Sequence, residues 1–149
     1  MQNASGVATI NAPAAQGISG ALREAGTAEL KDLTISSRLE LGHIIAVSLD
    51  GKPLATSRRI LLQAMSEEKA TDFRSEPAAG GDKKIISIGH DPWLAKELDG
   101  VVKFKRSDAS SLKVTALDFN GDPGKSIGTA SEIRLAPSTI YYLITPSGP

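Results

Sequence analysis

The chain has no cysteine, which excludes disulfide bonds and thiol chemistry. Aromatic residues are scarce: one Trp, two Tyr and three Phe make up 4% of the 149 residues. Seventeen Lys and Arg balance seventeen Asp and Glu, so there is no basic excess to attract a nucleic acid or an anionic membrane. No apolar run reaches the ~18 residues of a membrane-spanning helix. We therefore expect neither a nucleic acid nor a membrane as a partner.

The length predicts a single domain, residues 1–149, large enough to bury a core without disulfides or a metal. The N-terminus lacks a basic region followed by an apolar one, the pattern of a secretion signal. The protein is therefore either cytosolic or a domain cut from a longer secreted chain. The abrupt start on the strand-like Val7–Ile10 and the Pro-Ser-Gly-Pro ending favour the second interpretation, and with it an extracellular location.

Short β-favouring runs alternate with Gly, Pro, Asp and Asn turn signals, and no helical periodicity is sustained. From Gly100 to Lys105, for example, Val102 and Phe104 point to one side of a strand, while Lys103 and Lys105 point to the other. About nine or ten such runs predict an all-β fold, a two-sheet antiparallel β-sandwich of jelly-roll or immunoglobulin-like type.

The clearest supersecondary signal is a hairpin made by His43–Leu49 and Ile60–Met65. An Asp50-Gly51 pair follows the first run and suits a tight turn, because glycine accepts a positive φ at little cost. Both runs are almost continuously apolar, which predicts strands in the middle of a sheet, covered on both faces. Two other segments are ambiguous: Ala28–Ser36 indicates one strand with a bulge near Lys31, and Asp91–Leu98 indicates a helical turn.

Hydrolytic catalysis finds little support in the sequence. Only His43 and His90 could serve a Ser-His-Asp site; His43 opens an apolar strand, and His90 lies in a loop, where a structural role is still favoured. A glycosidase needs two carboxylates across a cleft lined with aromatic rings, and six aromatic residues cannot line a long cleft. We interpret Glu67, Glu68, Glu76 and Glu97 as surface charges and expect no catalytic residue.

Metal and cofactor sites are not expected either. Asp118, Asn120 and Asp122 place oxygen ligands at alternate positions, as at the start of a calcium-binding loop, but the later bidentate glutamate is missing. An Asn-Gly turn at a hairpin tip explains the same residues. No cluster has zinc-ligand spacing.

Aromatic platforms are the remaining binding signal, because sugars present apolar C–H faces that stack on exposed rings. Trp93, the only tryptophan, follows His90 and Asp91 in a Gly- and Pro-containing segment. Strand alternation also leaves Tyr141 on the face opposite Tyr142. We predict a carbohydrate-binding site formed by Trp93, His90, Asp91 and Tyr141; in the alternative interpretation Trp93 and Leu94 cap one end of the sandwich core.

Most of the chain, from about Val7 to Tyr142, resembles the C-terminal non-catalytic β-sandwich region of large multidomain glycoside hydrolases from environmental bacteria. The segments that carry the resemblance are 7–17, 30–36, 48–62, 112–121 and 140–142, and the sharpest is Ser-Leu-Asp-Gly-Lys-Pro-Leu-Ala-Thr-Ser-Arg-Arg-Ile-Leu-Leu at 48–62. The resemblance implies an ancillary, non-enzymatic module beside a polysaccharide-degrading catalytic domain in a secreted protein.

Two functions follow. The first is a carbohydrate-binding module that targets the linked enzyme to a β-glucan, a cellulose-type polymer or another plant polysaccharide. The second is a purely structural β-sandwich that packs on the catalytic domain and stabilises it, which the scarcity of aromatic residues favours.

Overall fold

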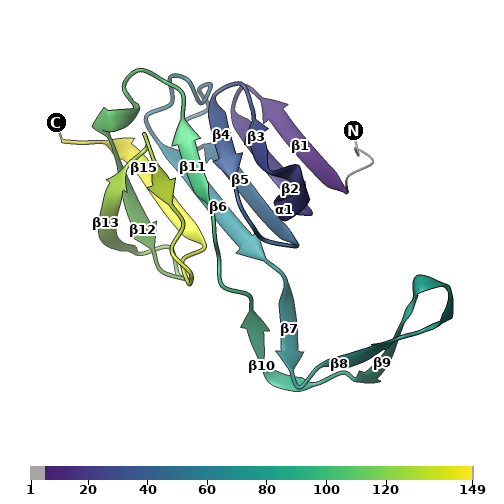
Figure 1. Cartoon of the computed structure of the whole chain (residues 1–149). Coiled ribbons are helices and arrows are strands. Elements are labelled where there is room, and N and C mark those ends of the chain that lie inside the picture. The colour runs from purple at the N-terminus through teal and green to yellow at the C-terminus, as the bar shows by residue number, and fades with distance from the viewer. Residues whose placement is uncertain (1–5, 149) are drawn as a thin grey trace. The chain divides into compact units, whose positions relative to one another are not determined.

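The computed structural model describes residues 6–148, and these residues form mostly antiparallel β-structure (Figure 1). Within this range there are fifteen strands rather than the expected nine or ten, because several are short partners in small sheets. The largest sheet has the strand order β1 (Val7–Ala12), β2 (Ala15–Gly20), β5 (Gly42–Ser48), β6 (Ile60–Ser66), β15 (Tyr141–Pro146), β12 (Leu112–Leu117) and β13 (Pro123–Thr129).

Three smaller sheets and three short helical turns complete the described chain. The four-stranded sheet has the order β14 (Ile133–Arg134), β11 (Val101–Phe104), β4 (Leu33–Ser36) and β3 (Thr27–Glu29). Two two-stranded ribbons pair β10 (His90–Ala95) with β7 (Glu68–Thr71), and β8 (Arg74–Pro77) with β9 (Lys83–Ser87). The helical turns are α1 (Leu22–Ala25), η1 (Ala79–Gly81) and η2 (Ala109–Ser111).

The chain divides into two compact units. Unit 1 contains the described residues up to Ser66 and those from Glu97 onward, and holds the seven- and four-stranded sheets. Unit 2 is the segment Glu67–Lys96, which contains both ribbons. The expected single domain spans both units and stays a prediction.

Unit 1 has one apolar core, to which both of its sheets contribute. Side chains alternate between the two faces of a strand, so every second residue enters the core. On β11 the buried residues are Val102 and Phe104, as predicted, while Lys103 is exposed. On β15 Tyr142 is fully buried, and its hydroxyl accepts a hydrogen bond from the backbone N–H of Ala136 at 2.8 Å.

The predicted central hairpin is confirmed: β5 pairs with β6, and the two lie third and fourth in the seven-stranded sheet. The expectation that both faces of these strands are covered is wrong. Ile44 and Leu62 are fully buried on the core face, whereas Ile45 is half-buried and Met65 is 43% exposed on the other. A continuous apolar run therefore does not require two-sided burial.

The β5–β6 connection is held by polar contacts around Asp50. Its Oδ1 atom accepts hydrogen bonds from the hydroxyls of Ser48, at 2.8 Å, and Ser57, at 2.7 Å, and Oδ2 accepts one from the backbone N–H of Arg58 at 2.9 Å. Leu54, in the same connection, is fully buried. Arg106 Nη1 donates to the carbonyl oxygens of Leu54 and Ser57, at 2.9 and 2.7 Å. These polar contacts give the segment 48–62 a role in the fold.

Residues 28–36 do not form one bulged strand. They turn back as a β3–β4 hairpin, closed by a hydrogen bond from the Leu30 backbone N–H to the Leu33 carbonyl oxygen at 2.9 Å. Buried Gln16 holds the turn: its side chain donates to Asp32 Oδ2 at 2.6 Å and accepts from the Asp32 backbone N–H at 2.8 Å.

Candidate functional site

Unit 2 exposes an unusual share of large apolar side chains. Trp93 is 61% exposed and Ile88 is 79% exposed, and further members of this set are Ile85, Ile86 and Leu94. All five lie on the two ribbons or on the connection between them. Because soluble proteins rarely cluster exposed apolar side chains without a use for them, unit 2 is the first place to look for a binding surface.

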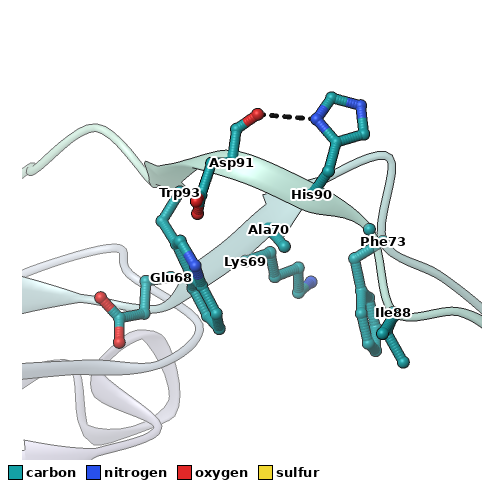
Figure 2. A pocket seen from close by; sticks show the side chains of 9 residues that line it. Glu68, Lys69, Ala70, Phe73, Ile88, His90, Asp91 and Trp93 are labelled. Carbon is teal, nitrogen blue, oxygen red and sulfur yellow. Dashed lines mark hydrogen bonds between the residues drawn. The ribbon is translucent and has the colours of Figure 1, made fainter.

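Trp93 lies on β10 opposite Ala70 of β7. The predicted helical turn at 91–98 is wrong, because residues up to Ala95 form strand β10, which pairs with β7. Figure 2 shows the rings of Trp93 and Phe73 on the same side of the ribbon, with Lys69 and Ala70 between them. Phe73 is half-buried, so both rings keep surface available for contact.

These two rings border a cavity of 760 Å³, called here the Trp93 cavity. Its apolar lining comes from Ala70, Phe73, Ile88 and Trp93. Its polar lining comes from Glu68, Lys69, His90 and Asp91. Binding sites for small molecules typically combine an apolar wall with a few polar groups, and a sugar ring needs both.

A sharp corner between β7 and β10 sets the position of Phe73. Gly89 has φ +74°, and a Cβ atom there would lie 2.3 Å from the carbonyl oxygen of Thr71, so only glycine fits without displacement. Opposite it, the Phe73 backbone N–H donates to the carbonyl oxygen of Ala70 at 3.1 Å. The hydroxyl of Thr71 donates to the Pro92 carbonyl oxygen at 2.6 Å and ties the two strands together.

His90 and Asp91 both border the Trp93 cavity. The imidazole, however, projects in Figure 2 to the side of the ribbon opposite the Trp93 ring. Its Nδ1 atom lies 2.6 Å from the Asp91 carbonyl oxygen, and Nε2 lies 3.2 Å from Asp72 Oδ2. Through these contacts His90 stabilises the corner between β7 and β10. Asp91, in contrast, is exposed at the cavity.

Tyr141, the fourth predicted site residue, lies in unit 1 and outside the set that lines the Trp93 cavity. It is half-buried on β15, where it pairs with Gln63 of β6 and Leu117 of β12. The prediction that Tyr141 faces away from the core is confirmed, since Tyr142 beside it is the buried member of the pair.

Glu67, which directly precedes β7, is paired with two lysines. The carboxylate of Glu67 lies 3.3 Å from Lys69 Nζ and 3.5 Å from Lys96 Nζ. The hydrogen bond from Lys69, together with both positive charges, holds the pKa of Glu67 below its usual value. Glu67 therefore stays ionised and orients Lys69, which lines the cavity.

Two arrangements with the composition of a hydrolytic site occur in the structure. In unit 1, Ser19 Oγ lies 2.7 Å from His43 Nδ1, but within residues 6–148 no carboxylate is hydrogen-bonded to this imidazole to orient it. In unit 2, Glu68 and Asp91 both line the Trp93 cavity and both are exposed. They come from the paired strands β7 and β10 of one ribbon.

The calcium-like segment 118–122 forms a turn in the structure. Oδ1 of Asp118 accepts hydrogen bonds from the backbone N–H groups of Asn120 and Asp122, both at 2.9 Å. This carboxylate therefore satisfies the turn backbone, the function that the Asn-Gly signal predicts. Nowhere in residues 6–148 do three or more His, Cys, Asp or Glu side chains gather in a way that would hold a metal ion.

Sequence reasoning missed Phe73, Glu68 and Ile88 as neighbours of Trp93. The only local signal was that Phe73 is one of six aromatic residues. Glu68 and Phe73 come near Trp93 because β7 pairs with β10, which joins residues about 20 positions apart.

In the described part of the chain, no helix has both the length and the apolar character needed to cross a membrane. Comparison with known proteins gave no match to a family model, to a curated protein or to a solved structure.

Proposed function

We propose that this chain is a non-catalytic carbohydrate-binding module, and that Trp93 and Phe73 form its sugar-binding platform. The observation that carries the proposal is the 61% exposure of Trp93 beside a second aromatic ring on the same face of the ribbon. An indole this exposed presents a large apolar surface to water, and an apolar sugar face that stacks on it removes this surface from water. Asp91, Glu68 and Lys69 then supply hydrogen bonds to hydroxyl groups around the ring.

The proposal includes the architecture in which such modules are built, a two-sheet β-sandwich of jelly-roll or immunoglobulin-like type. In its support, the seven- and four-stranded antiparallel sheets of unit 1 contribute side chains to one common core, such as Ile44 from one and Ile35 from the other. Under this proposal unit 2 carries the ligand, and unit 1 is the β-sandwich.

The resemblance supplies the biological setting of the proposal. The module belongs to a longer secreted glycoside hydrolase, has no enzymatic activity and no cofactor of its own, and brings the linked catalytic domain to a β-glucan, a cellulose-type polymer or another plant polysaccharide.

Affinity electrophoresis in gels containing soluble β-glucans, xylans and other plant polysaccharides tests the binding function. We expect at least one polymer to retard the chain and Trp93→Ala to abolish the retardation. Phe119→Ala is the matched control, because Phe119 is an aromatic residue of unit 1 that is 76% exposed. Retardation by none of the polymers would contradict the function, and retardation unaffected by Trp93→Ala would contradict the site.

A second function, that of a structural module, is favoured by the isoleucines of unit 2. Ile85, Ile86 and Ile88 are all exposed, and aliphatic side chains are better suited to a protein surface than to a sugar. In this role they pack on the linked catalytic domain. Substituting all three with Ser in the full-length enzyme would then lower the thermal stability of the catalytic domain and leave glycan retention unchanged.

A further inference from the structure

A second cavity of 660 Å³ lies beside the first in unit 2 and is called here the Arg74 cavity. Lys69 and Phe73 line both cavities, so the two are adjacent along the ribbons. The apolar lining of the Arg74 cavity comes from Phe73 together with Ile85 and Ile86. One long ligand is therefore able to contact both cavities.

The charge of the Arg74 cavity is predominantly positive. Lys69, Arg74 and Lys83 line it, against a single carboxylate, Glu76. Lys69 is already engaged with Glu67 at 3.3 Å. Arg74 and Lys83 are exposed, and among residues 6–148 neither forms an ion pair with a carboxylate. Two unpaired cations beside an apolar wall match a ligand that carries both an apolar face and a negative charge.

The Trp93 cavity has a different balance. Glu68 and Asp91 line it together with Lys69 and His90, so it offers no excess of positive charge. A polymer that spans both cavities therefore places a neutral sugar face on Trp93 and an anionic group near Arg74 and Lys83.

Resting on the proposed function, we propose that the ligand of unit 2 is an anionic polysaccharide: sugar faces stack on Trp93 and Phe73, and carboxylate or sulfate groups pair with Arg74 and Lys83. Carboxylates and sulfates share the chemistry that a guanidinium and an ammonium group recognise, so the experiment distinguishes them.

Calorimetry against three polymers tests this inference: polygalacturonate, its carboxyl-reduced neutral counterpart, and a sulfated galactan. We expect at least one of the two anionic polymers to bind about tenfold more tightly than the neutral one, and this preference to shrink between about 0.1 M and about 1 M salt, as screening requires. Binding of polygalacturonate alone assigns the anion as carboxylate, and binding of the galactan alone assigns it as sulfate.

Variants separate the inference from the function on which it rests. The pair Arg74→Ala and Lys83→Ala removes the preference for the anionic polymer and leaves neutral binding unchanged, whereas Trp93→Ala weakens both. The control pair Lys113→Ala and Lys125→Ala makes the same change in net charge on exposed positions of unit 1 and leaves the preference intact. Equal affinity for neutral and anionic polymers, with Trp93 still required, would overturn the inference and leave the proposed function standing. Binding to no polymer of any charge would overturn both.

Discussion

The Oδ1 atom of Asp50 accepts a hydrogen bond from the Oγ atom of Ser57 at 2.7 Å, across the connection between β5 and β6. The backbone N–H of Arg58 also donates to this carboxylate, at 2.9 Å. Asp50 and Ser57 thus draw the two ends of the connection together, and the segment 48–62 has a conformational role.

The first prediction concerns the pH dependence of stability that Asp50 causes. Hydrogen bonds from the Arg58 backbone N–H and then from the Ser57 hydroxyl hold the pKa of Asp50 well below its usual value. A carboxyl group whose pKa is lower in the folded state stabilises that state above its unfolded pKa of about 3.9, and the stabilisation is lost as the pH falls below that value. We expect Asp50→Asn to lower the midpoint of thermal unfolding clearly at neutral pH and less at about pH 3. An equal effect at both pH values would contradict this role.

The second prediction concerns Arg106, whose side chain is only 9% exposed. Its Nη1 atom donates to the carbonyl oxygens of Leu54 and Ser57, and its Nε atom lies 2.6 Å from Asp108 Oδ1. Arg106→Ala leaves both carbonyls without this donor, and we expect a loss of about 1.5–3 kcal/mol in the free energy of unfolding. Lysine cannot reproduce the fork of donors, so Arg106→Lys recovers only part. Urea denaturation measures the free energy of unfolding of both variants. Arg58→Ala is the control: Arg58 is exposed, and we expect its substitution to leave the free energy of unfolding unchanged.

The third prediction concerns Leu54, which is fully buried although it lies in a connection between strands. Leu54→Ala removes three buried carbon atoms and leaves a cavity, so we expect a loss of about 2–5 kcal/mol in urea denaturation. Leu49 lies in the same connection but is 47% exposed, and Leu49→Ala should change stability by no more than about 0.5 kcal/mol. Similar losses for the two variants would show that Leu54 does not anchor the connection.

The fourth prediction concerns the corner of unit 2 at Gly89. Alanine at this position combines a positive φ with a Cβ atom 2.3 Å from a carbonyl oxygen, so the corner must change shape. We expect Gly89→Ala to raise amide hydrogen exchange throughout unit 2 and to weaken glycan binding, with the core of unit 1 unaffected. Gly80→Ala is the matched control, because Gly80 has a similar φ of +79° but open space around it. If Gly80→Ala loosened unit 2 as much, the close approach at Gly89 would not be the cause.

Sequence reasoning succeeded where the controlling interactions are local. Alternation along β11 and β15 correctly assigned Val102, Phe104 and Tyr142 to the core, because successive side chains of a strand point to opposite faces of the sheet. It failed at residues 28–36, where the side chain of Gln16, which lies on the distant strand β2, holds the turn. It failed again at 91–98, where pairing with β7 decides the conformation of the backbone.

The candidate site shows the same division. Trp93 and Asp91 were predicted from a local signal, a single Trp in a Gly- and Pro-containing segment, and both line the Trp93 cavity. Phe73 has no such signal, because it reaches Trp93 only through the corner at Gly89 and the pairing of two strands. Tyr141 was selected by strand alternation alone, which predicts the face of a strand but not its distance from another segment.

Fluorescence of Trp93 provides the most direct measurement, because it is the only tryptophan and lies at the centre of the proposed platform. Titration with a polysaccharide that binds the chain should shift the emission to shorter wavelength and protect it from acrylamide quenching, with saturation, because a sugar ring replaces water on the indole. Emission and quenching that stay unchanged while the polymer binds, or that no polysaccharide perturbs, would contradict the claim that Trp93 is a sugar-binding platform.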